Sequence, residues 1–362
     1  MNLDRLNEFT KKNILFTGEI LSGDKIVANV INDEVIPIDR DRIPLFFIAN
    51  NSFREWIKSR SFDSSRTNVR LLKKILNIRS CEDIDFAIKF HAISLTDNYW
   101  CRLKNERKLK YEDVSSLDDR LHRSALFGEF NENPNYNTPE ISNLGSFEKC
   151  WVKENDNWYL KKIATDNELF SEIFVYRLCK NLKLPAAEYT YDTVNDCVSS
   201  KRFISNKYNL EEMKNILGDN DDFEMSLEVI NTVNPKLTKQ FLDILFIDAI
   251  CYNFDRHTGN YGFIRNGETG EIVSMAPNYD NNNSLISREI RESVMAPKLF
   301  LDNYKSFLDK NSYDYPFISN ELVIQSINET INEIGRTNRV YDYEVSKYVK
   351  DFVLNNYDYL LG

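Results

Sequence analysis

Residues 253–283 contain the residue types that phosphoryl transfer needs, at spacings that suit this reaction. The reaction needs a carboxylate that orients and deprotonates the attacking hydroxyl group, and oxygen ligands that hold Mg²⁺ against the phosphates. Asn260 follows Asp255 by five residues, a spacing known from loops that catalyse this reaction. We therefore predict that Asp255 is the catalytic base and that Asn260 is a metal ligand.

A second metal ligand is expected after the next turn of the chain. Strand-like runs at 261–265 and 271–275 flank the turn formers of 266–270, which indicates a hairpin. Because a hairpin returns the chain to its start, Asp280 should lie beside Asn260. Each of these residues alone is typical of a loop cap, and their combination indicates a metal pair.

A cation for the ATP phosphates is predicted upstream of this loop. Lys161 lies on the second strand of a predicted hairpin, and Glu172 lies on the next helix, where it could fix the lysine. Neighbouring side chains of a strand point to opposite faces, so Lys162 competes with Lys161 for this role. Glu168, one helical turn earlier, is an alternative acid.

Two further residues could contribute to the site. Gly145, just before the predicted hairpin, could let the loop at 143–146 place backbone amides over a phosphate. His257 is expected to pack or to form hydrogen bonds within its loop, because a histidine without a second histidine or cysteine nearby more often satisfies its neighbours than acts as a base.

The first part of the chain predicts a small sheet followed by helices. Ser52 and Glu55 form a capping-box pattern, after which Phe53, Trp56 and Ile57 fall on one helical face. The other predicted elements of this part are strands at 14–16, 25–30 and 34–38 and helices at 69–76 and 82–90. A polar stretch at 105–145 predicts a boundary with long loops.

The last part predicts a mainly helical lobe. Residues 236–252 are apolar on too many sides for a surface helix, which indicates a buried central helix. A helix capped by Asp166 or Asn167 precedes it, and two amphipathic helices follow near 324–334 and 345–353. The predicted domains are an α/β extension at 1–135, an ATP-binding lobe at 136–205 and a helical lobe at 206–362.

Composition limits the classes of protein. With 362 residues and 42% hydrophobic residues, the chain is long enough for two lobes. The net charge of −10 argues against direct binding of nucleic acid or acidic membranes. Six irregularly spaced cysteines and three histidines do not suggest a zinc site or a disulfide framework. With no signal peptide and no apolar run of about 20 residues, a soluble cytoplasmic protein is expected.

The motif at residues 253–260 resembles the Asn-x-Asp-Arg-His-x-x-Asn hallmark of the HipA-like serine/threonine kinases, and Tyr-Asp-Asn around Asp280 is similar to their second metal motif. The resemblance covers about 140–360. The leading region is similar to that of the shorter single-chain members of this family.

Upstream segments carry the same resemblance. The strand ending at Lys161 resembles the ATP-lysine strand of the family, and the helix containing Glu172 resembles the helix that supplies its glutamate. Lys201 and Phe203 stand in a strand similar to the one that leads into the adenine-binding hinge. By the same resemblance, Ser146 is the candidate for autophosphorylation.

The resemblance implies an α+β, bilobal protein-kinase-like fold, with a mixed α/β N-terminal lobe and a mainly helical C-terminal lobe. It implies ATP and Mg²⁺ as cofactors, a protein substrate with a Ser or Thr acceptor, and a toxin–antitoxin role with a small antitoxin partner. Two alternatives stay open: a kinase of lipids or small molecules, and a nucleotide-binding pseudokinase that acts as a regulatory module.

Overall fold

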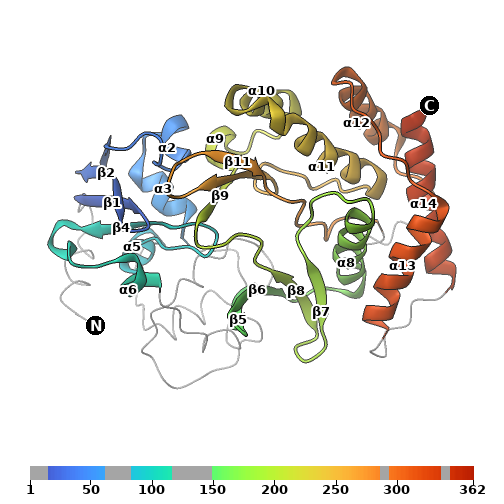
Figure 1. Ribbon diagram of the computed structural model, residues 1–362, viewed down its shortest axis with the longest axis horizontal. Coiled ribbons are helices and arrows are strands. Elements are labelled where there is room, and N and C mark those ends of the chain that lie inside the picture. The colour runs from blue at the N-terminus through green and yellow to red at the C-terminus, as the bar shows by residue number, and fades with distance from the viewer. Residues whose placement is uncertain (1–14, 62–82, 116–148, 286–292, 336–342) are drawn as a thin grey trace. The chain divides into compact units, whose positions relative to one another are not determined.

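The protein divides into two compact units, each built from several stretches of chain. The computed structural model describes residues 15–61, 83–115, 149–285, 293–335 and 343–362 (Figure 1). The first unit comprises residues 1–162, 204–218 and 263–273, and the second comprises 163–203, 219–262 and 274–362. The predicted helix at 69–76 and the loop at 143–146 lie outside the described residues. The predicted division at 135 and 205 stays a prediction.

An antiparallel sheet with the strand order β3-β2-β1-β4 opens the first unit. Its strands are β1 (Gly18–Ser22), β2 (Lys25–Ile31), β3 (Glu34–Pro37) and β4 (Tyr99–Leu103). The predictions of strands at 25–30 and 34–38 are confirmed. The predicted strand at 14–16 is wrong for Leu15 and Phe16, because Phe16 precedes the sheet and stacks in the core on Phe53, with ring centroids 4.4 Å apart.

The helices described in the first unit are α2 (Phe46–Ala49), α3 (Phe53–Ser59), α5 (Asp83–Lys89), the 3₁₀ turn η1 (Lys104–Glu106), α6 (Tyr111–Ser115) and α9 (Lys214–Leu217). Three of them, α2, α3 and α5, contribute buried side chains to this core. The predicted cap of α3 is confirmed, since Ser52 Oγ accepts a hydrogen bond from the Glu55 amide at 3.3 Å. Phe53, Trp56 and Ile57 are buried, as their helical spacing predicts.

A second sheet, most of whose residues belong to this unit, contains the hairpin predicted at 261–275. Its order is β11-β10-β9, with β9 (Tyr208–Glu212), β10 (Gly262–Asn266) and β11 (Ile272–Met275). A buried ion pair between Arg265 Nη1 and Glu211 Oε1, at 3.1 Å, joins β10 to β9. The Tyr99 hydroxyl donates to the same carboxylate at 2.7 Å, which ties β4 to β9.

Glu212 is expected to make the protein less stable as the pH rises from about 4.5 to about 7. Burial raises the pKa of its carboxyl group from 4.5 to about 7, while Lys149 and Lys214 oppose the effect. The folded state then holds this proton more tightly than the unfolded state, so stability is full at low pH and falls across this window. The loss is about 3 kcal/mol at most.

Thermal unfolding of the wild type and of Glu212→Gln between pH 4.5 and pH 8 measures this contribution. The variant should lose part of the decline in midpoint that the wild type shows. Parallel profiles would mean that Glu212 titrates in the folded protein as it does in the unfolded chain.

The second unit is mainly helical, with a buried helix at its centre. Its helices are α8 (Asp166–Asn181), α10 (Phe223–Val233), the 3₁₀ turn η4 (Pro235–Leu237), α11 (Thr238–Cys251), α12 (Lys298–Lys310), α13 (Asn320–Ile334) and α14 (Tyr343–Leu361). Residues 241–251 of α11 are all buried, which confirms the prediction of a buried helix. α11 packs against α10, α12 and α14, and α13 packs against α8 (Figure 1).

Helix α8 begins one residue earlier than predicted. Thr165, rather than Asp166 or Asn167, is its N-cap, because the Thr165 side chain accepts from the Glu168 amide. The Glu168 carboxylate in turn accepts from the Thr165 amide at 2.8 Å, which completes a capping box. Glu168 therefore already has a structural role at the start of α8. In the part of the chain that the structure describes, no helix has the length and apolarity needed to cross a membrane.

Candidate active site

The loop that carries Asp255 starts where α11 ends in the second unit. Tyr252 ends the helix in the left-handed conformation, with φ of 53°. Asn253 then folds back, and its Nδ2 donates to Asp248 Oδ1 of α11 at 3.2 Å. Its Oδ1 accepts from the Asp255 amide at 3.2 Å. The chain therefore leaves the core in a turn that is fixed by one hydrogen bond to α11 and one hydrogen bond within the loop.

The buried side chain of Arg256 fixes this loop through hydrogen bonds. Its guanidinium is fully buried and pairs with Asp248 through contacts of 2.7 and 2.8 Å. Nη1 also donates to the carbonyls of Asn260 and Tyr279, at 2.8 and 2.7 Å. Nη2 donates to the side-chain oxygens of Asn278 and Asn281, both at 2.9 Å. One side chain thus joins α11, the loop and the segment around Asp280.

Asp248 and Arg256 stabilise each other's charged forms in the protein interior. Burial raises the pKa of the Asp248 carboxyl group, an effect that the charge of Arg256 opposes. For Arg256, burial acts in the other direction, but the Asp248 carboxylate outweighs it and raises the pKa of the guanidinium. Arg256 therefore stays protonated, and its donors remain available to the loop.

The segments that carry Asp255, Asn260 and Asp280 lie together in the second unit. The Ala276 amide donates to the Gly262 carbonyl at 2.8 Å, which closes the base of the hairpin. The Tyr279 hydroxyl donates to the Gly259 carbonyl at 3.0 Å. These contacts confirm that the hairpin returns the chain to its start, as its turn signals predict.

Asp255 has an exposed carboxylate on a fixed backbone. Its carbonyl accepts from the His257 amide at 2.9 Å and from Asn260 Nδ2 at 3.1 Å. Its Oδ2 accepts from Asn283 Nδ2 at 2.7 Å. His257 is exposed, and its Nδ1 accepts a hydrogen bond within its own loop, from the Gly259 amide at 3.1 Å. This hydrogen bond agrees with the structural role predicted for His257.

Asp280 is held in an unusual backbone conformation by two buried side chains. Its φ is 57°, in the left-handed region, and its amide donates to the Tyr189 hydroxyl at 2.9 Å. The next amide, of Asn281, donates to Glu172 Oε2 of α8 at 2.8 Å. Burial, together with the charges of Glu172 and Asp280, raises the pKa of Tyr189, so the hydroxyl stays neutral. Tyr189 lies on β7 (Tyr189–Asp192), which pairs with β8 (Cys197–Lys201).

The oxygen donors of Asn260 and Asp280 fit a hard divalent cation. Asn260 Nδ2 is used by the Asp255 carbonyl, so the amide oxygen is the atom left for a ligand. Carboxylate and amide oxygens suit Mg²⁺, which takes one or two carboxylates and completes its shell with water and phosphate. Among the described residues, no group of three or more His, Cys, Asp or Glu side chains could hold a metal.

Of the residues predicted to bind the ATP phosphates, the structure describes the lysine, which belongs to the first unit. Lys161 lies on β6 (Asn157–Lys162), which forms a hairpin with β5 (Lys149–Glu154), and its ammonium pairs with Glu154. Both Lys161 and Lys162 are buried, so strand alternation does not decide between them. Gly145 and Ser146 lie outside the described residues.

The residues predicted to bind adenine lie in the second unit. Lys201 ends β8, and its amide donates to the Glu188 carbonyl at 3.1 Å. Phe203 is partly exposed and packs on Tyr279, with ring centroids 5.7 Å apart. Phe203 therefore contacts the segment that carries Asp280.

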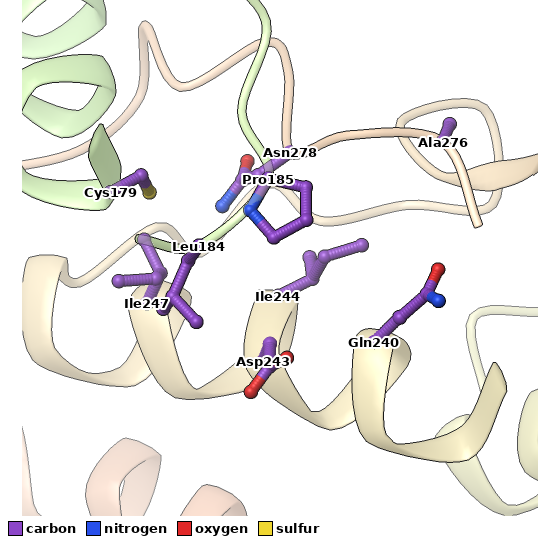
Figure 2. A pocket seen from close by; sticks show the side chains of 9 residues that line it. All are labelled: Cys179, Leu184, Pro185, Gln240, Asp243, Ile244, Ile247, Ala276 and Asn278. Atoms are coloured by element: carbon purple, nitrogen blue, oxygen red, sulfur yellow. The ribbon is translucent and has the colours of Figure 1, made fainter. Parts of the chain in front are cut away.

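A small cavity of the second unit lies beside Asn278 (Figure 2). It is lined by residues of α8 and α11, by the Leu184–Pro185 turn and by Ala276 and Asn278. It has room for a water molecule but is far smaller than a nucleotide pocket.

Three positions in this site were missed by the sequence analysis: Asp248, Tyr189 and Asn283. The only signal for Asp248 is a charged residue within a stretch of α11, residues 244–251, that is otherwise apolar. Buried charges are rare unless they are paired, and this indicates a specific partner without identifying it.

Comparisons with known proteins agree with the motif. Residues 141–338 match the family model described as the HipA-like C-terminal domain. The chain is 26% identical over 171 residues to the serine/threonine-protein kinase CtkA of Helicobacter pylori, strain J99. This match covers 43% of the chain and 51% of the relative, so the chain spans about half the length of that curated protein.

Two solved structures are also similar. The crystal structure of the proinflammatory kinase CtkA of Helicobacter pylori is 20% identical, covers 58% of this chain and 90% of its own, and has a TM-score of 0.42. HipA of Shewanella oneidensis MR-1, solved with HipB and operator DNA, is 14% identical and covers 95% of this chain and 96% of its own, with a TM-score of 0.54. The mixed α/β fold with antiparallel sheets is therefore shared with HipA.

Proposed function

We propose that this chain, which belongs to the HipA-like C-terminal domain family, is an ATP- and Mg²⁺-dependent serine/threonine protein kinase. The observation that carries the proposal is that buried Arg256, the residue next to Asp255, donates to the carbonyls of Asn260 and Tyr279 and so joins the Asp255 loop to the Asp280 segment, within the residues that match the family model. The match to CtkA, a serine/threonine-protein kinase, supports the same reaction. A bilobal arrangement of the protein-kinase type is part of this proposal.

In the proposed reaction, Asp255 accepts the proton of a serine or threonine hydroxyl. The hydroxyl oxygen forms a bond to the γ-phosphorus of ATP, the bond from that phosphorus to the bridging oxygen breaks, and ADP leaves. Asn260 and Asp280 would hold Mg²⁺, which supplies charge neutralisation at the phosphates. The backbone hydrogen bonds of Asp255 and Asp280 fix the main chain from which both carboxylates project, and in this proposal positioning and charge account for most of the rate.

The remaining assignments stay predictions. They place Lys161 and the Gly145 loop on the ATP phosphates, Glu172 beside Lys161, Lys201 and Phe203 at the adenine, and autophosphorylation on Ser146. The described contact of Glu172 with the Asn281 amide gives this acid a structural role in the second unit as well.

Incubation of the purified protein with γ-labelled ATP and Mg²⁺, followed by mass spectrometry, tests the proposed function. Label on a serine or threonine of the chain, or of an added acceptor protein, is the expected result. Binding of ATP without any transfer would favour a nucleotide-binding regulatory module, and transfer to small molecules or lipids alone would favour a kinase of those substrates.

Tyr189→Phe is expected to raise the Mg²⁺ concentration that gives half-maximal transfer by about fivefold. The change leaves the Asp280 amide without its acceptor, and a buried hydrogen bond of this kind contributes roughly 1 kcal/mol. Titration of Mg²⁺ at saturating ATP measures the shift. Tyr191→Phe, on the same strand, is the matched control, because the hydroxyl of Tyr191 contacts the exposed Asp196. An unchanged Mg²⁺ dependence would contradict the role of Tyr189.

A toxin role with a small antitoxin partner is a further proposal, supported by the likeness of fold to HipA, which was solved with HipB. A small DNA-binding protein encoded beside this chain, and its co-purification with the chain, would be the expected findings. Growth that is unaffected by expression of the chain alone would contradict the toxin role.

A further inference from the structure

A direct hydrogen bond joins the proposed base to the segment of the second metal ligand. Asn283 Nδ2 lies 2.7 Å from Asp255 Oδ2, and Asn283 follows Asp280 by three residues. The backbone of Asp255 is held by its own loop, but its carboxylate is exposed to solvent. The hydrogen bonds to the Asp255 main chain hold the loop, whereas the hydrogen bond from Asn283 affects the orientation of the carboxylate itself.

The requirement for orientation follows from the chemistry. A base acts only when its free oxygen lies within hydrogen-bond reach of the hydroxyl proton, and an exposed carboxylate rotates away from any single position. An amide that donates to one carboxylate oxygen adds no charge. It restricts rotation of the carboxylate, so that the second oxygen points in a fixed direction. Asn283 is half-buried and can hold this direction before an acceptor arrives.

We propose that Asn283 is a positioning residue, which orients the Asp255 carboxylate and links the base to the Asp280 segment. This inference rests on the proposed kinase function. It predicts an effect on turnover rather than on ATP binding, because Asn283 acts on the proton acceptor and not on the nucleotide.

The competing explanation is that Asn283 only closes its loop. An isosteric change separates the two. Asn283→Asp keeps the size of the side chain but replaces the donor by a second carboxylate beside Asp255, which repels it. If Asn283 acted by packing alone, Asn283→Asp would be tolerated better than Asn283→Ala. If it orients the base, Asn283→Asp should be the worse of the two.

The experiment measures kcat and the KM for ATP of the wild type, Asn283→Ala and Asn283→Asp, each with Asp255 intact and with Asp255→Ala. We expect kcat to fall about tenfold for Asn283→Ala and further for Asn283→Asp, with the KM for ATP within about twofold. In the Asp255→Ala background, neither change should lower the residual rate further, because the group through which Asn283 acts is gone. Asn220→Ala, at an exposed loop asparagine with one hydrogen bond, is the matched control.

The outcomes distinguish this inference from the function on which it rests. If the wild type transfers phosphate and both Asn283 variants stay within twofold of it, or if losses are additive with Asp255→Ala, the positioning role is overturned while the kinase function stands. If the wild type transfers no phosphate to protein, the proposed function fails and the inference fails with it. Thermal midpoints of all variants identify any loss that comes from unfolding.

Discussion

Replacing Asp255 by alanine is expected to lower the rate of phosphoryl transfer by about 10²- to 10⁴-fold while ATP still binds. In the proposed mechanism, the exposed Asp255 carboxylate accepts the proton, and other residues bind the ATP phosphates. The fold should tolerate the change, because the buried pair of Asp248 and Arg256 and the backbone hydrogen bonds of the loop remain.

Labelled ATP and mass spectrometry measure the transfer, and calorimetric titration measures ATP binding. Asp358→Ala is the matched control, since Asp358 is exposed on α14 and lies outside the loop. Asp255→Asn should be as inactive as Asp255→Ala, because an amide keeps the shape of the side chain but accepts no proton at neutral pH. Full activity in both Asp255 variants would assign the proton acceptor to another group.

The local signals of the sequence predicted features that depend on neighbours along the chain. The cap at Ser52 and the return of the hairpin are such short-range features, and each follows from capping or turn chemistry. The same kind of signal was available for α12, whose buried Leu301, Tyr304 and Leu308 recur at helical spacing, but it was not used.

The contacts that hold the site could not be predicted, because they join residues far apart in the sequence. Tyr189 and Glu172 reach the amides of Asp280 and Asn281 across about 90 and 110 residues. Every residue except proline has a backbone amide. The sequence therefore does not indicate which amide will donate a hydrogen bond to a given buried side chain. The alternation of β6 also failed to separate Lys161 from Lys162, because both are buried.

Asp248→Ala is expected to produce a large loss of stability, about 3–5 kcal/mol. The side chains of Asp248 and Arg256 are both fully buried, and removal of the acid leaves an uncompensated guanidinium inside the second unit. The same guanidinium also holds the carbonyls of Asn260 and Tyr279, so the loop should lose its geometry together with its stability. Transfer activity is therefore expected to fall even under conditions in which the variant remains folded.

Urea unfolding followed by circular dichroism measures this loss, with activity assayed well below the midpoint. Lys239→Ala is the matched control on the same helix, because it breaks an ion pair with Asp243 in which the lysine is 67% exposed, and such pairs contribute at most about 1 kcal/mol. Arg256→Lys should also be strongly destabilising, since an ammonium cannot reproduce the planar set of donors that reaches both backbone carbonyls and the carboxylate. A loss for Asp248→Ala no larger than that of Lys239→Ala would mean that the buried pair does not organise the loop, and the positions of Asp255 and Asp280 would then need another cause.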